Sequence, residues 1–149
     1  MNALHGHIAV VTGAGSGVGQ AIACALGAQG ATLCLVGRTL ATLEATACSI
    51  SNAKAAIRCY PTDLTHASAV QTLAEQLHRD WDTLDILVHS AGVYAMGTLE
   101  AAPVTELDLQ YRTNVRAPYL LTQALLPLLR RRQGQVVFIN SSVGLTARG

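Results

Sequence analysis

Short, continuous apolar runs alternate along the chain with longer stretches in which apolar residues recur at helical spacing. Glycine or proline bounds most of these runs, which is typical of strands that are covered on both faces. The pattern predicts five strands, at residues 8–11, 31–36, 55–60, 84–88 and 135–140. A helical stretch separates each strand from the next.

The helical stretches have recognisable faces and ends. The first, which follows a glycine-rich loop, places Val18, Ile22, Ala25 and Leu26 on one face. Threonines at 39 and 65 are expected to cap the second and third helices. A longer helical region from about 103 to 132 is expected to be broken near Asn114.

This alternation predicts the fold class. Strands that alternate with helices form right-handed βαβ units, and these give an α/β protein with a doubly wound parallel sheet and helices on both faces. At 149 residues the chain is expected to form one domain. Ligands of such sheets bind at the carboxyl ends of the strands, where the strand order reverses. Glycine or polar clusters follow every predicted strand there, at 12–19, 37–39, 63–64, 89–92 and 140–142.

The glycine-rich loop after the first strand is the strongest of these clusters. Its glycines do not fit the usual Gly-x-Gly-x-x-Gly fingerprint, because Val18 stands where the third glycine would be. They fit a different spacing, with Gly13 for the turn, Gly17 at the helix entry and Gly19 for close packing of the helix against the strand. A helix that begins after such a loop offers unpaired N–H groups and suits a phosphate or pyrophosphate.

Composition narrows the classes of partner. The formal charge of +1 gives no field for nucleic acid, and the apolar stretch 117–129 is too short for a membrane span. No secretory signal is visible, so we expect a cytoplasmic protein. The four cysteines lack metal-ligand spacing and are expected to be buried thiols, and no metal site is expected among the five histidines.

The chain resembles the tyrosine-dependent short-chain dehydrogenases/reductases over essentially its whole length. The resemblance rests on the glycine loop and on four later segments. His89-Ser90-Ala91-Gly92 stands where the family has Asn-Asn-Ala-Gly, and we interpret His89 as a hydrogen-bonded residue at a strand end. The other segments are Asp63-Leu64, Asn114-Val115 and Val137-Phe138-Ile139-Asn140-Ser141-Ser142.

The resemblance implies a Rossmann-type domain over residues 1–149 that binds a nicotinamide dinucleotide. Asp63 is implied to contact the adenine. The residues implied to bind the cofactor are Gly13, Gly15, Ser16, Gly17, Val18, Gly19, Arg38, Thr39, Asp63, Leu64, Ser90, Ala91 and Gly92.

The end of the second strand predicts which cofactor is preferred. Enzymes that prefer NAD place an acid there for the ribose 2′-hydroxyl, whereas a 2′-phosphate needs that acid absent and a cation nearby. Here Gly37 occupies the place and Arg38 follows. The sequence therefore predicts NADP(H) over NAD(H).

The resemblance also implies catalytic roles. Ser142 would hold the carbonyl of a ketone or secondary-alcohol substrate, with Ser141 as the alternative, and Asn114 would complete a proton relay. The family's Tyr-x-x-x-Lys does not occur in the 149 residues, where Lys54 is the only lysine. We therefore expect an N-terminal cofactor-binding part of a longer oxidoreductase, with an incomplete sheet and no activity alone. The family also implies a homo-oligomer, with the helix from Asn114 to Arg132 at the interface.

Two other functions stay open. A non-catalytic dinucleotide-binding module would carry the same loop, and a methyltransferase also has a glycine loop after its first strand. The Asn114 and Ser141-Ser142 segments speak against the methyltransferase.

Overall fold

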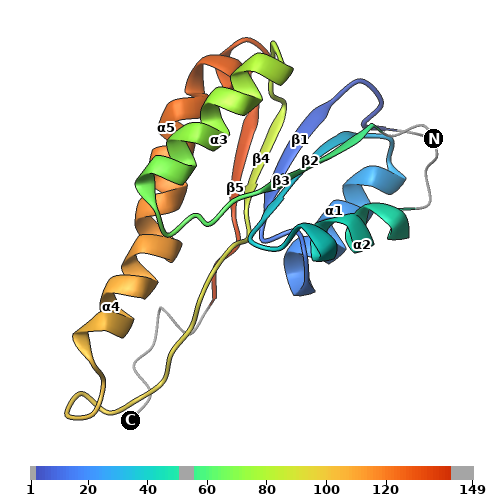
Figure 1. Ribbon diagram of the computed structural model, residues 1–149. Coiled ribbons are helices and arrows are strands. Elements are labelled where there is room, and N and C mark those ends of the chain that lie inside the picture. The colour runs from blue at the N-terminus through green and yellow to red at the C-terminus, as the bar shows by residue number, and fades with distance from the viewer. Residues whose placement is uncertain (1–2, 51–55, 142–149) are drawn as a thin grey trace.

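A computed structural model describes residues 3–50 and 56–141 of the chain. Its centre is a five-stranded sheet in which every neighbouring pair of strands is parallel, in the order β3-β2-β1-β4-β5 (Figure 1). This is the doubly wound order, so the predicted fold class is confirmed. The strands are β1 (Ile8–Thr12), β2 (Thr32–Gly37), β3 (Ile57–Pro61), β4 (Ile86–His89) and β5 (Gln135–Phe138).

Helices cover both faces of the sheet (Figure 1). On one face lie α1 (Gly17–Ala28) and α2 (Leu40–Ser49), and on the other lie α3 (Ala67–Asp80) and α5 (Ala117–Arg130). The short helix α4 (Val104–Tyr111) lies beyond the end of the sheet and continues through a π-helical turn, η1 (Arg112–Arg116), into α5. The helical region predicted to be broken near Asn114 is therefore continuous, and the irregularity there is a change of helical pitch.

The core is split into two layers by the sheet. Val10 of β1 packs with the α3 and α5 side, whereas its neighbours Ala9 and Val11 pack with the α1 and α2 side. This alternation follows from the period-2 geometry of a strand, and it explains why the central strands are apolar without interruption.

The buried face of α1 differs from the prediction. Gly19, Ala23 and Gly27 are buried, whereas Val18 is 58% exposed and Ala25 is exposed. The small residues let the helix approach its neighbours closely, since a Cβ added at Gly27 would lie 2.5 Å from Cγ2 of Ile50. Ile22 and Leu26 of the predicted face are half-buried against the same core cluster, so the prediction holds for these two residues.

The predicted N-cap residue is confirmed for α2 but not for α3. Thr39 is the N-cap residue of α2 but makes no side-chain capping bond. The helix α3 begins one residue later than expected, with His66 as its N-cap. Thr65 instead donates its hydroxyl to Asp63, which competes with capping.

The cysteines are free thiols that are less buried than expected. Only Cys34 is fully buried, and burial raises its pKa to about 12. Cys24 and Cys59 are half-buried, and Cys48 is exposed near the end of α2. No helix in residues 3–50 and 56–141 has the length and apolar character needed to cross a membrane. No group of three or more His, Cys, Asp or Glu in these ranges could hold a metal ion.

Candidate functional site

A cleft of about 520 Å³ lies at the carboxyl edge of the sheet, between the segments that follow β1, β2, β3 and β4. Every residue predicted to bind the cofactor lines it: Gly13, Gly15, Ser16, Gly17, Val18, Gly19, Arg38, Thr39, Asp63, Leu64, Ser90, Ala91 and Gly92. The structure thus brings together four segments that are far apart in the sequence. Other lining residues were not predicted, among them Thr42, Thr62, Thr65, Val93, Leu109 and Thr113.

Glycines allow the loop after β1 to fit between its neighbours. Gly13 has a φ of +67°, and a Cβ added there would lie 2.9 Å from the Cα of Ala91. A Cβ added at Gly19 would overlap the carbonyl oxygen of Gly13. The close packing expected of Gly19 is therefore with the loop itself, so the first turn of α1 rests directly on the loop backbone.

The N-terminus of α1 opens into this cleft. Ser16 is its N-cap residue and makes no side-chain capping bond, and the first helical bond runs from the Gln20 N–H to the Ser16 carbonyl, at 3.1 Å. The N–H groups of the first turn therefore have no acceptor inside the helix. A Cβ added at Gly17 would meet no atom within 4 Å among the described residues, so the space in front of this turn is open. The arrangement fits a phosphate or pyrophosphate.

Two buried threonines hold the loops around the cleft. The Thr12 hydroxyl oxygen accepts hydrogen bonds from the N–H groups of Ser90 and Ala91, both at 3.1 Å, and thereby joins the end of β1 to the segment after β4. The Thr46 hydroxyl on α2 donates to the carbonyl of Ala14, at 2.9 Å. Sequence analysis placed Thr12 only within the glycine-rich cluster 12–19, and it did not predict any role for Thr46.

The segment after β2 supplies the positive charge of the cleft. Gly37 ends the strand, and the side chains of Arg38 and Thr39 that follow are exposed along the cleft. No acidic residue stands at this strand end. The segment thus offers a guanidinium and a hydroxyl to an anion.

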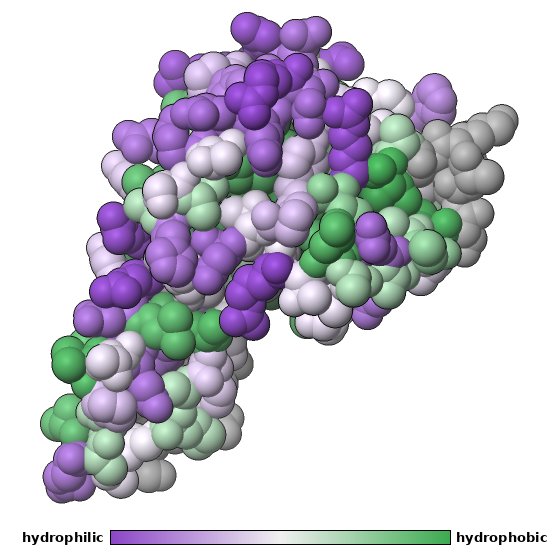
Figure 2. Space-filling view, viewed as in Figure 1, coloured by the Kyte–Doolittle hydropathy of each residue, from purple (hydrophilic) through white to green (hydrophobic). Residues whose placement is uncertain are grey.

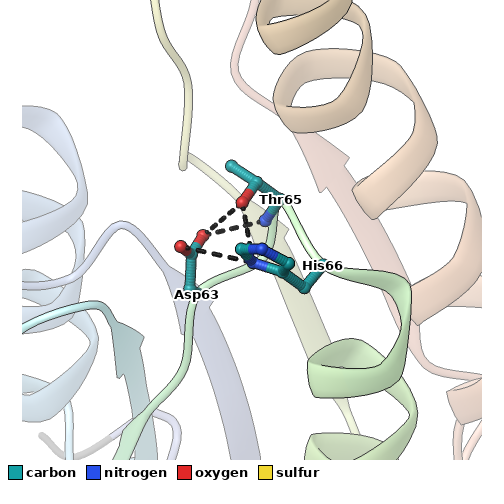
Figure 3. A network of polar contacts seen from close by, with 3 residues as sticks. All are labelled: Asp63, Thr65 and His66. Atoms are coloured by element: carbon teal, nitrogen blue, oxygen red, sulfur yellow. Dashed lines mark hydrogen bonds and ion pairs between the residues drawn. The ribbon is translucent and has the colours of Figure 1, made fainter.

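The segment after β3 supplies a carboxylate (Figure 3). Asp63 Oδ1 accepts hydrogen bonds from the N–H of Thr65, at 3.0 Å, and from its hydroxyl, at 2.8 Å, and Oδ2 lies 3.5 Å from Nδ1 of His66. These bonds, led by the Thr65 N–H, lower the pKa of Asp63, with smaller contributions from His66 and Arg38. Asp63 is therefore an ionised acceptor at neutral pH, held in place beside the cleft.

His89 is the last residue of β4, and its side chain is buried. Its Nε2 lies 2.8 Å from the Thr122 hydroxyl of α5, and its ring stacks on Phe138 with centroids 4.9 Å apart. Burial lowers its pKa to about 4, so the imidazole is neutral at pH 7. These contacts agree with the interpretation of His89 as a hydrogen-bonded residue at a strand end.

Asn114 binds the segment that follows β4. Its Oδ1 accepts from the Val93 N–H, at 2.9 Å, and its Nδ2 donates to the Val93 carbonyl, at 2.8 Å. Its side chain therefore holds η1 against the Val93 segment, which lines the cleft. Ser142, the other predicted catalytic residue, lies outside the described residues. Ser141 is described, and its N–H donates to Oδ1 of Asn140, at 2.8 Å.

Comparison with known proteins decides the family. The family model described as short chain dehydrogenase matches residues 7–148. The chain belongs to this family. Nodulation protein G of Rhizobium sp. (strain N33) is 35% identical over 144 residues, which are 96% of this chain and 58% of that protein. An uncharacterized oxidoreductase of Staphylococcus aureus (strain MW2) is 34% identical over 97% of this chain and 62% of its own length.

Solved structures share the fold of this chain at similar identity. A metagenomic short-chain oxidoreductase in complex with NADP superposes with a TM-score of 0.90 at 34% identity, over 98% of this chain and 67% of that one. The RhlG/NADP complex of Pseudomonas aeruginosa gives 0.91 at 35% identity, over 99% and 59%. The chain thus spans roughly three fifths of the length of the curated relatives, 58% and 62% in the two above.

Proposed function

We propose that this chain binds NADP(H) in the cleft, in preference to NAD(H). It would form the cofactor-binding part of an oxidoreductase that transfers hydride between the nicotinamide and a ketone or secondary alcohol. The observation that carries the proposal is that a glycine loop, an open helix N-terminus, a guanidinium and a carboxylate all line one cleft. Family membership and the two NADP complexes among the similar structures support it.

The pyrophosphate, the 2′-phosphate and the adenine of the dinucleotide would each have a counterpart in the cleft. The pyrophosphate would lie against the first turn of α1, where N–H groups and the helix dipole favour anions. Arg38 and Thr39 would hold the 2′-phosphate, and Asp63 would accept a hydrogen bond from the adenine amine. Ser90, Ala91 and Gly92 would form the wall next to the glycine loop.

Arg38 is the basis of the cofactor preference. A charge-assisted hydrogen bond to phosphate is worth roughly 1.5–3 kcal/mol, or about 10- to 150-fold in affinity. NAD(H) carries a hydroxyl in place of this phosphate and lacks the interaction. An acid at the end of β2 would repel the phosphate, and none is present there.

The catalytic assignments remain proposals from the family. The nicotinamide supplies or accepts the hydride when it is bound. Ser142 would hold the substrate oxygen by a hydrogen bond. Asn114 would complete the proton relay, and its two hydrogen bonds to the Val93 backbone would hold its side chain in place.

Replacement of Arg38 by alanine tests the proposed cofactor preference. We expect the wild type to bind NADPH at least 10-fold more tightly than NADH, and Arg38→Ala to reduce this ratio to near one by weakening NADPH alone. Titration of each protein with both cofactors measures the ratio. Arg79→Ala, which removes an exposed cation from α3, is the matched control and should leave the ratio unchanged. Equal wild-type affinities, or an unchanged ratio in Arg38→Ala, would contradict the proposal.

The non-catalytic module shares the binding step, and for this polypeptide both functions predict binding without turnover. No Tyr-x-x-x-Lys segment occurs in the 149 residues, so we expect this polypeptide by itself to bind NADPH without oxidising it in the presence of ketones. A positioned acid or base is worth roughly 10²–10⁴-fold in rate, and the polypeptide lacks the family's pair. An NADPH-oxidation assay over a panel of ketones measures this directly.

A further inference from the structure

Ala14 lies in the glycine loop, and two elements hold it by its backbone. Its N–H donates to the carbonyl of Val36 in β2, at 3.1 Å. Its carbonyl accepts from the hydroxyl of Thr46 in α2, at 2.9 Å. Ala14 and Thr46 are both 0% exposed, so the bond between them is shielded from water. The backbone of Ala14 is therefore fixed on both sides.

The two elements that hold Ala14 also carry the proposed 2′-phosphate site. Arg38 and Thr39 form the whole connection between β2 and α2. The proposed pyrophosphate site begins directly after Ala14, at Gly15, and extends to the first turn of α1. The two hydrogen bonds of Ala14 thus join the loop of one phosphate site to both elements that flank the other. They fix the distance between the two sites.

The bond from Thr46 differs from the usual bond of a threonine in a helix. Thr72 of α3 donates to the carbonyl of Ser68, four residues earlier, which is the common arrangement. The hydroxyl of Thr46 lies 3.1 Å from the corresponding carbonyl, that of Thr42, but only 2.9 Å from the carbonyl of Ala14. A hydroxyl has one proton to donate, and the nearer acceptor belongs to the glycine loop.

Helix α2 touches the loop at a second point, one turn earlier. A Cβ added at Gly15 would overlap the hydroxyl oxygen of Thr42. That hydroxyl donates to the carbonyl of Thr39, at 2.8 Å, so its proton is used within the start of α2. The contact at Gly15 is therefore one of packing, whereas Thr46 supplies a directional bond to the loop.

The bond to Ala14 also sets the direction of the next N–H group. The Ala14 carbonyl and the Gly15 N–H belong to one planar trans peptide, so a donor that holds the oxygen fixes the N–H as well. Peptide groups that are oriented before an anion arrives bind it without the cost of ordering them. The buried hydroxyl on α2 can thus affect a ligand that it does not touch.

We propose that Thr46 is a positioning residue for the pyrophosphate, which acts by holding the Ala14 carbonyl and so orients the peptide groups of the glycine loop. This inference rests on the proposed function and adds to it a residue outside the cleft lining. Its consequence is selective. Ligands that carry the diphosphate depend on Thr46, whereas a ligand held through the 2′-phosphate alone does not.

The test compares Thr46→Val, which keeps the shape and removes the hydroxyl, with Thr46→Ser, which keeps the hydroxyl. Isothermal titration uses NADPH, ADP, which carries the diphosphate without a 2′-phosphate, and adenosine 2′-monophosphate, which carries the 2′-phosphate without the diphosphate. We expect Thr46→Val to bind NADPH and ADP about 3- to 10-fold more weakly and adenosine 2′-monophosphate within about twofold of the wild type. Thr46→Ser should stay within about twofold for all three ligands.

A control variant separates positioning from a general loss of stability. Ala74 is buried on α3, in the core layer on the opposite side of the sheet. Ala74→Gly should lower the melting temperature, because glycine weakens a helix interior, and should leave all three affinities unchanged. Hydrogen exchange without ligand gives a further readout. The Ala14 amide, which bonds Val36, should exchange faster in Thr46→Val than in Thr46→Ser.

Each contrary result has a defined meaning. Wild-type affinities of Thr46→Val for NADPH and ADP, or unchanged exchange at Ala14, would overturn the inference and leave the proposed function intact. An equal loss for adenosine 2′-monophosphate would also overturn it, because the hydroxyl would then support α2 as a whole. The same holds for an equal loss in Thr46→Ser or Ala74→Gly. A wild type that fails to bind any one of the three ligands would instead overturn the proposed phosphate sites, and this inference with them.

Discussion

Single hydroxyl groups hold the walls of the cleft together. Thr12 connects β1 to the segment after β4 through two N–H donors, and Thr46 connects α2 to the glycine loop. Both side chains are buried, so each bond is shielded from water and fixes the distance between two segments. The glycine loop is thus held from two sides before any ligand arrives.

His89 makes the stability of the fold depend on pH. Burial lowers its pKa from the ordinary 6.5 to about 4, so the unfolded chain binds a proton at pH values where the folded chain does not. Stability from this group is therefore complete above pH 6.5 and is lost as the pH falls toward 4. Between pH 7 and pH 4.5 we expect the loss to be about 2 kcal/mol.

Urea unfolding of the wild type and of His89→Asn at both pH values isolates this effect. The variant has no titrating group at position 89, so its free energy of unfolding should fall less with acidification. Asp63 and Asp80, whose pKa values are also lowered, titrate alike in both proteins and cancel. Equal pH dependence in the two proteins would show that His89 is not buried as a neutral group.

The residues of the cleft were predictable where the backbone geometry requires a particular residue type or a regular sequence pattern. Gly13 and Gly17 adopt positive φ, which glycine tolerates best, and the alternation of strands and helices places every strand end at one edge. Thr46 and Thr113 meet neither condition. Thr46 bonds a carbonyl 32 residues away, and Thr113 lines the cleft from a π-helical turn that no spacing predicts.

At the scale of elements, the segment α4–η1–α5 links one cleft wall to the core. The α5 end is packed against α3 and the sheet through Leu121 and Leu125, whereas no residue of α4 is buried. Between them, η1 carries Asn114 and Thr113. Within this wider helical turn, Asn114 bonds the Val93 backbone, and its neighbour Thr113 is one of the residues that line the cleft.

Asn114→Ala tests the connection between η1 and the Val93 segment. The change removes two hydrogen bonds to the Val93 backbone, so we expect a loss of about 1–2 kcal/mol in stability and faster hydrogen exchange at the Val93 amide. Asn114→Asp keeps the oxygen that accepts from this amide and should retain most of its protection. Unchanged exchange in Asn114→Ala would show that the two side-chain bonds do not restrain the segment.

Element types were predictable, whereas element faces and ends were less so. Five strands and the helices between them follow from hydrophobic runs and from helical spacing, which long segments display clearly. The predicted face of α1 was right for Ile22 and Leu26, which pack against the core, and wrong for Val18 and Ala25. Hydrophobicity favours large side chains, whereas the fully buried residues of this helix are Gly19, Ala23 and Gly27. The predicted start of α3 was wrong because the Thr65 hydroxyl, which was expected to cap the helix, bonds Asp63 instead.

At the scale of the whole molecule, large apolar side chains remain on one continuous helical surface. Leu107, Tyr111, Val115 and Tyr119 recur every four residues along α4, η1 and α5 and are 54% to 66% exposed. Figure 2 shows hydrophobic side chains gathered in the region where Figure 1 places α4. Contiguous apolar surface of this kind marks an interaction site more often than isolated exposed residues do.

We expect this surface, defined by Leu107, Tyr111, Val115 and Tyr119, to join two copies of the chain. Self-association through one helical surface is isologous, so each apolar side chain is used twice and a single charge there is introduced twice. Tyr119→Glu should therefore shift the protein from dimer or larger species to monomer. Thr72→Glu, which places the same charge on the exposed side of α3, should not. Size-exclusion chromatography with light scattering over a range of protein concentrations gives the masses. A wild type that is monomeric throughout, or a Tyr119→Glu protein that associates as the wild type does, would show that this surface does not join copies of the chain.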